Sequence, residues 1–596
     1  MRAAKQDVKT GSWFVKKVFA IVRWLRKVIF SVSRPQPRQS EDLLKLRRFG
    51  LEGHSSARFQ GKAGGFNGIL LACLLVPPLY FAGTLEPKTI GDGQEYFLQL
   101  WALSSHLSPD IRLSDIESFS DYLREYKLLG FKESVLSDLK KQIESGNKRI
   151  SYYFLRAPSG SYYGLHFWFY AALCVPAKWA LHILHGNELK AFQLTNALLL
   201  VIGLAYLLFV RSIALELRIA AALLFYGVGT PYYLRWSNPE IFSTVACLIA
   251  SIAFLERRLT LATLTCGLGA TQNPSLALMI PVIFASQLDQ WLKISILVKA
   301  RVAGKFFMTG SLSFLPFAFY LVTFGTPSLI MREGYLDNSL IDFNRLYSLF
   351  FDLNQGMLVG AGWIMALSSL VLISRFFPNR ADRRMMALCL QREDWLLAGM
   401  LLMAIGVLPQ INWNSGQAVY TRYAIWISIP LMLWTVCQIS TVKRGRLCLV
   451  LVIAAQLLTV YLFGAFSRSD EESHYLDHKR IAIAILRHAP WAYNPEPEIF
   501  VERTVNREVD ISQWRELVVF IPYNKGSVMK KILVHKTKLN ALSAEICGDS
   551  HELMTEQGDR IQPNMYKNTR FDFMYLSGSF LCFPQPIFKH TMKRSL

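Results

Sequence analysis

Asp92 is the residue of this sequence best suited to acid–base chemistry. It stands in a Gly-Asp-Gly tripeptide, residues 91–93, where the glycines let the backbone turn tightly and leave the carboxylate open to a cleft. A carboxylate placed in this way can act as a general base toward a hydroxyl group. The alternative is an N-cap of the helix that follows, because Asp is among the preferred capping residues. Glu95, two residues after the tripeptide, is a candidate substrate-binding residue.

A second acid, Glu240, ends the stretch Trp-Ser-Asn-Pro-Glu at residues 236–240, and Arg235 comes directly before this stretch. Glu240 could orient an acceptor, bind a cation or support Asp92, and Arg235 is a candidate substrate-binding residue. The alternative for Glu240 is structural, since Pro followed by Glu commonly begins a helix and satisfies its dipole.

Two further arginines are candidates for substrate binding. Arg422 precedes Tyr423, another candidate substrate-binding residue, at the start of an apolar run. An arginine at a membrane surface can hold a phosphate with two N–H groups. Its alternative role is an interfacial anchor in an aromatic belt. Arg345 lies in residues 337–355, where we expect an amphipathic surface helix and a Phe-Asp-Leu-Asn-Gln-Gly turn that closes the site.

His166 and Lys178 could reach a lipid phosphate from the outer face of a membrane, although an interfacial His and a snorkelling Lys fit the same pattern. The nine cysteines follow no metal-ligand spacing, so we expect no metal site from cysteine. No cofactor is indicated with certainty, a divalent cation stays an open alternative, and we expect no nucleic-acid partner.

Long apolar runs must position these residues. The chain has 596 residues, of which 52% are hydrophobic and 18% are charged. Uncharged runs such as 192–210, 306–325 and 447–467 approach the ~20 residues that cross a bilayer as a helix. We therefore predict an all-α polytopic membrane protein with about eleven transmembrane helices in residues 67–466.

The N-terminal segment predicts the orientation. Residues 1–66 hold fifteen Lys or Arg and four acids, which indicates a basic cytoplasmic arm with an interfacial amphipathic helix. A signal peptide and a disordered arm are the alternatives. A first span from about residue 67 would then lead to a large external loop, 86–163.

The later loops alternate between basic and nearly neutral. The basic ones should be cytoplasmic, so Asp92, Glu240 and Arg422 should share the external face. This alternation requires that the apolar stretch 164–185 does not cross the membrane, and we expect a juxtamembrane or re-entrant element there.

From about residue 467 to 596 the chain becomes polar, and we expect a small extracytoplasmic domain of mixed α/β type. Cys547 and Cys582 lie in it and could pair if the compartment is oxidising. Pairing and free thiols both stay open.

The order of these pieces resembles the GT-C class of integral membrane glycosyltransferases, which includes protein mannosyltransferases and the lipid A aminoarabinose transferase. The likeness covers about residues 67–466. It is carried by the Gly-Asp loop, Tyr-Tyr-Gly with the apolar piece after it, Pro239-Glu240, the Gly-Leu-Gly-Ala-Thr-Gln-Asn-Pro stretch and Arg422-Tyr423. Gln272 or Asn273 stands where the class carries a lysine.

The resemblance implies an inverting transfer of sugar from a polyprenyl-phosphate carrier to a glycan, lipid or protein of the cell envelope. It implies Asp92 as catalytic base with Glu240 as a second catalytic acid, in the bacterial inner membrane with the C-terminus on the periplasmic or external side. A secondary transporter is disfavoured because the spans hold essentially no ionisable residues. A non-enzymatic flippase or a scaffold of polysaccharide assembly is the alternative, and glycan ligation or polymerisation is a close chemical relative.

Overall fold

The structure is a computed structural model that describes residues 68–584 apart from twelve short gaps. The gaps are 132–133, 151–153, 211, 294, 377–390, 414–421, 463–475, 522–527, 549–550, 558, 563–564 and 570. The predicted basic arm with its interfacial helix, 1–66, lies outside the described residues.

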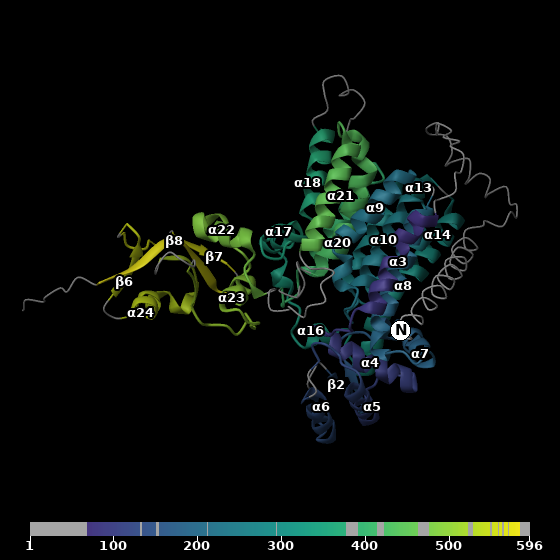
Figure 1. The fold of residues 1–596 in the computed structure, drawn as a ribbon, viewed down its shortest axis with the longest axis horizontal. Helices are drawn as coiled ribbons and strands as arrows, with labels where there is room; N and C mark the ends of the chain where they lie inside the picture. Colours follow the sequence, from purple (N-terminus) through teal and green to yellow (C-terminus); the bar gives the residue numbers. More distant parts are fainter. Residues whose placement is uncertain are drawn as a thin grey trace, which may run out of the picture.

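The first apolar helix and the segment after it form a layer of helices with a three-stranded antiparallel sheet (Figure 1). Its elements are α3 (Gly68–Thr84), α4 (Gly93–His106), α5 (Leu113–Glu125), α6 (Ser134–Glu144), β1 (Arg149–Ile150), β2 (Phe154–Arg156), β3 (Tyr162–Gly164) and α7 (Phe169–Ile183). Aromatic side chains fill the layer: Trp101 packs on Phe119 with ring centroids 4.6 Å apart, and Tyr170 of α7 joins the same core. This core fixes α4, the helix that carries the Gly-Asp-Gly motif at its start.

The body of the protein is a bundle of helices with short 3₁₀ turns between them. The helices are α8 (Ala191–Phe209), α9 (Leu215–Gly227), α10 (Glu240–Leu255), α11 (Leu259–Ala270), α12 (Met279–Ala285), α13 (Leu288–Lys293), α14 (Ile296–Gly310), α15 (Leu315–Phe324), α16 (Leu329–Arg332), α17 (Phe343–Phe351), α18 (Met357–Phe376), α19 (Asp394–Val407), α20 (Arg422–Gln438) and α21 (Gly445–Leu462). The 3₁₀ turns of the chain are η1 (Glu188–Lys190), η2 (Thr230–Tyr233), η3 (Pro274–Leu278), η4 (Ser311–Phe314), η5 (Asn338–Leu340), η6 (Ile439–Thr441), η8 (Pro490–Ala492) and η9 (Lys536–Ala541).

Five helical stretches of the described chain are long and apolar enough to cross a membrane. They are Glu188–Phe209, Lys299–Phe324, Met357–Arg375, Arg422–Thr441 and Gly445–Leu462. Five shorter apolar helices of 10–17 residues accompany them: Ala72–Thr84, Glu240–Leu255, Leu259–Ala270, Pro274–Ala285 and Asp394–Val407. The mainly helical class with candidate membrane spans is thus confirmed, whereas the predicted eleven spans are not.

Chain breaks explain why some of the apolar runs are divided into helices too short to cross a bilayer alone. A helix of 12 residues such as α11 is only about 18 Å long at ~1.5 Å per residue, against ~30 Å of hydrocarbon. After α11 the chain turns at residues 271–273 and continues through η3 into α12. A polar segment is thereby introduced between two apolar helices.

The two ends of the bundle differ in chemistry. At one end Arg375 of α18 pairs with Asp394 of α19, and the Trp434 indole of α20 donates to the same carboxylate at 3.0 Å. The opposite end holds the starts of α10 and α20, which meet the start of α4. The stretch 164–185 ends in α7, which packs against α4 and α8 beside this layer and does not span the bundle (Figure 1).

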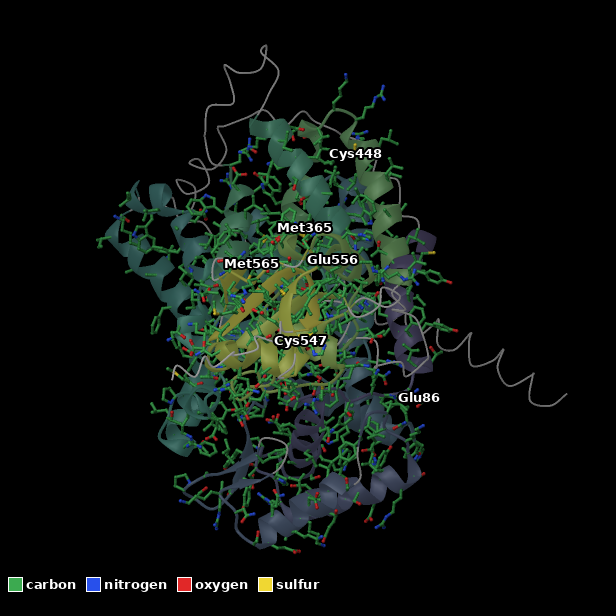
Figure 2. All side chains as sticks on the ribbon, turned by 90° about the vertical axis from the view of Figure 1, so that its left-hand side faces the viewer. Glu86, Met365, Cys448, Cys547, Glu556 and Met565 are labelled. Atoms are coloured by element: carbon green, nitrogen blue, oxygen red, sulfur yellow. A yellow bond between two sulfur atoms is a disulfide. The ribbon has the colours of Figure 1, made fainter. Side chains whose placement is uncertain are left out.

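The described residues after the bundle form an α/β unit, which agrees with the mixed α/β class expected for the tail. Its elements are α22 (Arg480–His488), α23 (Pro497–Val505), β4 (Val518–Phe520), β5 (Met529–His535), α24 (Leu542–Cys547), β6 (His551–Thr555), β7 (Tyr566–Asn568) and β8 (Phe573–Pro584). The strands pair antiparallel in the order β4-β5-β8-β6, and β7 also pairs with β8. Figure 2 shows this unit in front of the helical body, with Cys547 labelled on it.

A buried polar interface joins this domain to the turn before α18. The Tyr493 hydroxyl donates to Asp352 Oδ2 at 3.0 Å and accepts from Asn354 Nδ2 at 2.8 Å. Arg503 donates to Gln355 at 2.9 Å. The Phe-Asp-Leu-Asn-Gln-Gly turn, predicted to close the site, therefore binds the C-terminal domain. The amphipathic surface helix predicted just before it is confirmed as α17, where Phe343 is 77% exposed.

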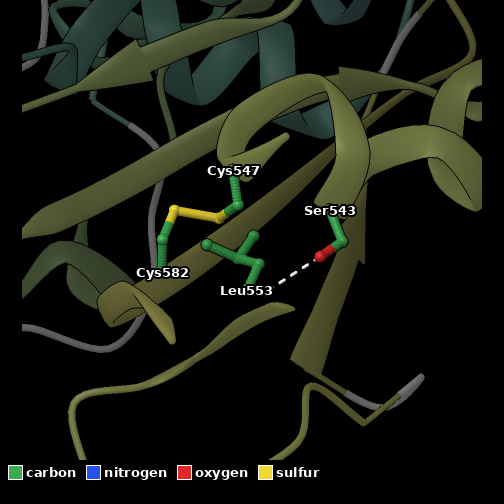
Figure 3. Close-up of a disulfide and its surroundings, with 4 residues drawn as sticks. All are labelled: Ser543, Cys547, Leu553 and Cys582. Atoms are coloured by element: carbon green, nitrogen blue, oxygen red, sulfur yellow. Dashed lines mark hydrogen bonds between the residues drawn. A yellow bond between two sulfur atoms is a disulfide. The ribbon is translucent and has the colours of Figure 1, made fainter. Parts of the chain in front are cut away.

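Cys547 and Cys582 form a disulfide that closes a separation of 35 residues and ties α24 to β8 (Figure 3). Leu553 of β6 donates its backbone N–H to Ser543 beside it, at 2.8 Å. Of the two alternatives left open by the sequence, the structure has the paired one.

Candidate functional site

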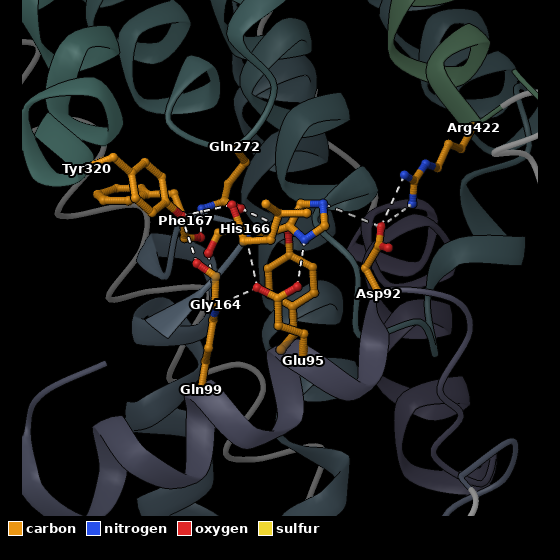
Figure 4. A network of polar contacts seen from close by, with 11 residues as sticks. Asp92, Glu95, Gln99, Gly164, His166, Phe167, Gln272, Tyr320 and Arg422 are labelled. Carbon is orange, nitrogen blue, oxygen red and sulfur yellow. Dashed lines mark hydrogen bonds and ion pairs between the residues drawn. The ribbon is translucent and has the colours of Figure 1, made fainter. Parts of the chain in front are cut away.

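Asp92 points into a cluster of charged side chains at the end of the bundle that carries the starts of α4, α10 and α20 (Figure 4). Gly91 before it has φ +49°, a left-handed conformation that favours glycine. Asp92 is the residue before α4, yet its side chain makes no capping hydrogen bond. The capping alternative is therefore wrong, and the carboxylate is directed elsewhere.

Glycine at position 93 allows α4 to approach the segment before α10. A Cβ at Gly93 would collide with the Ser237 hydroxyl and lie 3.2 Å from Asn238 Oδ1. The Asn238 amide, oriented to satisfy both of its ends, donates to Ile90 O and accepts from Arg422 Nη1, each at 3.3 Å. The second glycine of the motif thus sets how closely Asp92 and Glu240 approach.

Arg422 brings the two predicted catalytic acids together. Its Nη1 and Nη2 each lie 3.2 Å from Asp92 Oδ2, and its Nε lies 3.6 Å from Glu240 Oε1. Its guanidinium carbon lies 5.5 Å from the ring centroid of Tyr423, which is buried. The 17% exposure of the Arg422 side chain fits a site residue better than a surface anchor.

Glu240 begins α10, so the helix-start interpretation holds, and its carboxylate also faces the site. The residue is 2% exposed, and Oε2 has no hydrogen-bond partner among the described residues. Since buried carboxylate oxygens normally have partners, this atom has spare capacity to accept a proton or a donor group.

His166 completes the cluster from the opposite side. Its Nε2 lies 3.7 Å from Asp92 Oδ2, and its Nδ1 lies 2.8 Å from Glu95 Oε2. Glu95 also accepts the backbone N–H of His166 at 2.8 Å. The imidazole is therefore fixed by one carboxylate while its other nitrogen faces Asp92.

Glu95 lies behind His166, with a side chain that is 0% exposed. Gln99, one helical turn further along α4, donates to Glu95 at 3.1 Å and to the His166 carbonyl at 2.9 Å. Glu95 thus orients His166 and does not itself line open space, unlike the predicted substrate-binding role. Sequence reasoning overlooked Gln99, although its i, i+4 spacing from Glu95 indicates a shared helix face.

The charges shift the pKa values of two groups. Burial alone would favour the neutral ring of His166, but the carboxylates of Glu95 and Asp92 and the hydrogen bond to Glu95 outweigh it and raise its pKa to about 9. Burial alone would also raise the pKa of Asp92, but the charges of His166 and Arg422 and the Arg422 hydrogen bonds hold it below 3.8. At neutral pH the centre is an imidazolium and a guanidinium around an aspartate.

Gln272, which stands in the turn after α11, supports the cluster from a third side. It accepts from the Tyr96 hydroxyl at 3.3 Å and donates to Phe167 O at 2.7 Å. Tyr320 of α15 donates to Leu165 O at 3.0 Å. No sequence pattern marked Tyr320, because the contact depends on two segments more than 150 residues apart.

Two predicted substrate-binding residues lie elsewhere. Lys178 pairs with Glu188 at 3.1 Å and lies 4.1 Å from the Trp101 ring centroid. Arg345 is fully buried and donates to the carbonyls of Leu408 and Ile411, each at 3.1 Å. Their roles are structural, because short buried polar contacts within the fold occupy both cations.

Arg235 lies half-buried in the turn that connects η2 to Glu240. Within the described residues no group of three or more His, Cys, Asp or Glu side chains is arranged to hold a metal ion.

Comparison of the sequence with protein-family models finds no match, and comparison with curated proteins finds no match either.

Proposed function

We propose that this protein is a membrane glycosyltransferase that moves a sugar from a polyprenyl-phosphate carrier to an acceptor hydroxyl in the cell envelope. The observation that carries the proposal is the Arg422–Asp92 pair with His166 beside it, at 3.2 Å and 3.7 Å. It joins two anion-binding groups to one base at the end of a bundle with candidate membrane spans.

Arg422 and His166 are the groups suited to the donor phosphate. A guanidinium binds phosphate oxygens with two parallel N–H groups, and an imidazolium adds a third donor. In the structure both cations face Asp92. Phosphate would compete with Asp92 for both cations, and their charge would then stabilise the leaving phosphate.

Asp92 is the proposed general base. While Arg422 and His166 face its carboxylate, its pKa lies below the ordinary range and it is a weak base. When the donor phosphate neutralises these cations, the pKa of Asp92 rises toward or above its ordinary value and the carboxylate accepts a proton more readily. Donor binding thereby prepares the base.

The proposed reaction is a single displacement at the anomeric carbon of the sugar. Asp92 takes the proton of the acceptor hydroxyl, and the oxygen forms a bond to the anomeric carbon. The bond between that carbon and the phosphate oxygen breaks on the opposite face, so the configuration inverts. The negative charge that develops on the phosphate is stabilised by Arg422 and His166. Glu240 holds Arg422 in position through Nε.

The proposed location of the Asp92 cluster is the extracytoplasmic side of the membrane. The C-terminal domain binds residues 352–355, directly before α18, and Trp413 before α20, where Glu498 accepts the Trp413 backbone N–H at 2.8 Å. The domain therefore docks at the same end as Arg422. Its disulfide supports an oxidising compartment for that end, consistent with a bacterial inner membrane whose periplasmic face carries the site.

The test is sugar transfer from labelled membrane lipid by Asp92→Asn protein at equal folded abundance. We expect a loss of about 100- to 10,000-fold, the range of a removed general base, with donor binding retained. Asp121→Asn is the matched control, because Asp121 is 69% exposed on α5. Unchanged transfer by Asp92→Asn would contradict the assignment and favour a carrier or scaffold.

A further inference from the structure

A cleft opens between the small sheet and the end of α15, apart from the Asp92 cluster. Its volume is about 770 Å³, within the range of small-molecule sites. It is lined by Lys148, residues 155–160, Phe324, Arg332 and Glu333. None of these residues has a role in the proposed transfer step.

The lining is basic, with three cations against one carboxylate. Arg156 donates to Gly146 O at 3.1 Å and approaches Gly160 O at 3.4 Å, which fixes its guanidinium at the rim. Arg332 pairs with Glu333 at 3.0 Å. The exposed Lys148 ammonium makes no hydrogen bond or ion pair with the part of the chain that the structure describes. The surplus of positive charge favours an anionic occupant.

The walls of this cleft are also the supports of the Asp92 cluster. Arg156 of β2 pairs with Tyr162 of β3, and His166 follows Tyr162 by four residues, about 13 Å of chain at ~3.3 Å per residue. On the other wall Phe324 shares α15 with Tyr320, whose hydroxyl holds the Leu165 carbonyl. Leu155, Leu165 and Phe324 pack in one small apolar core between cleft and cluster.

The position of Phe324 relates the cleft to the membrane. Phe324 is the last residue of the candidate span Lys299–Phe324, and Arg332 follows eight residues later. A ligand in the cleft would therefore lie where a membrane-crossing helix ends, at the level of lipid head groups and of glycans attached to them.

We propose that this cleft binds an anionic group, a carboxylate or a phosphate, on the acceptor. The identification of the ligand as the acceptor rests on the proposed function, whereas the binding of an anion does not. The donor phosphate belongs to Arg422 and His166, so a separate basic cleft takes the other substrate and holds its hydroxyl toward Asp92. The anionic group is either a sugar acid of a glycan or the phosphate of a lipid head group.

The test is calorimetric titration of the full-length protein in discs of neutral lipid. The probes are trigalacturonate as a sugar acid, short-chain phosphatidic acid as a lipid phosphate, and maltotriose as a neutral sugar. We expect at least one anionic probe to bind and maltotriose not to bind. The anionic probe that binds more tightly identifies the source.

Lys148→Gln/Arg332→Gln should weaken the binding of that probe by about tenfold or more, since two charge-assisted contacts are lost. The matched control is Lys141→Gln/Arg124→Gln, which removes two exposed cations of α6 and α5 outside the cleft and should keep wild-type affinity. Absence of binding by both anions, or equal affinity of the cleft variant and the wild type for the bound anion, would overturn the inference.

Sugar transfer is measured separately from anion binding, so the two proposals can fail independently. Asp92→Asn should bind the anionic probe as wild type does while transferring no sugar. If the wild-type protein bound the probe through Lys148 and Arg332 but transferred no sugar under any condition, the transfer proposal would fail and the anion site would stand.

Discussion

The charge of His166 depends on the carboxylates beside it. Glu95 at 2.8 Å and Asp92 at 3.7 Å keep the ring protonated at neutral pH, with a pKa of about 9. In the proposed mechanism this proton faces the donor phosphate. The protonation state of His166 should thus be visible in the pH dependence of transfer.

We expect kcat/KM for the donor to fall as pH rises through about 9, where His166 loses its proton. The free energy of unfolding should also fall as pH rises through this range. Because the folded pKa exceeds the unfolded value of 6.5, the contribution of His166 is fully present below pH 6.5 and is lost as pH rises through about 9. Initial-rate and thermal-unfolding profiles between pH 6 and 10 check both statements.

Glu95→Gln should shift this alkaline limb to lower pH by roughly one unit or more, because the largest favourable charge on His166 is removed. A role for Glu95 in packing alone would lower folded abundance and leave the limb in place. Glu117→Gln is the control, since Glu117 is 55% exposed and pairs with Lys140.

At the scale of elements, the site depends on how closely α4 approaches the segment before α10. Gly93 is the contact point, where any Cβ would meet Ser237. The close approach places Asp92 near Arg422, with Asn238 between the two segments.

Gly93→Ala should destabilise the solubilised protein by about 1–3 kcal/mol, as expected for overpacking. Adding Ser237→Ala should recover part of the loss, because the hydroxyl that collides is removed. Gly83→Ala is the control: no atom lies within 4 Å of the added Cβ, and alanine favours a helix. Thermal unfolding in detergent measures the stability of the three variants. Equal effects of Gly93→Ala and Gly83→Ala would contradict the close contact between Gly93 and Ser237.

At the scale of the whole molecule, the C-terminal domain is fastened to the bundle by buried polar groups. Tyr493 is central, because its hydroxyl joins Asp352 to Asn354. Glu498 and Gln355 both bind the backbone of Trp413, at 2.8 Å and 3.1 Å. This interface ties the domain to the end of the bundle that carries Arg422.

Tyr493→Phe should loosen this interface by about 1–3 kcal/mol, the cost of leaving buried partners unsatisfied. Hydrogen exchange should rise at residues 352–356 and in α23 while the bundle stays protected. Tyr347→Phe on α17, where the side chain is 50% exposed, should change neither. Unchanged exchange in Tyr493→Phe would mean that other contacts carry the docking.

The disulfide tests the orientation of the molecule. In intact cells Cys547 and Cys582 should react with maleimide only after a reductant is added. After reduction, the Cys547→Ser/Cys582→Ser protein should carry two maleimide labels fewer than the wild type. Labelling of both thiols without reductant would place the domain in a reducing compartment. Loss of this 35-residue link should cost about 4 kcal/mol in the chain-entropy account.

The sequence alone indicated the mainly helical class and the α/β tail, and it singled out Asp92, Glu240, His166 and Arg422 as candidate site residues. The signals used were apolar runs, positive charge and glycine around an acid. Each depends only on residues that are close together in the sequence. Lys178 and Arg345 carried similar local signals, but Lys178 also contacts Trp101 and Arg345 binds Leu408, each in a distant segment.

Only the tertiary structure decided which of these residues meet. Arg422 reaches Asp92 across 330 residues of chain, and Gln355 and Trp413 meet because two helix starts lie at one end of the bundle. The break between α11 and α12 and the role of Tyr320 likewise depend on packing between remote segments. Long-range contacts of this kind depend on how whole helices fill space together, which no local pattern encodes.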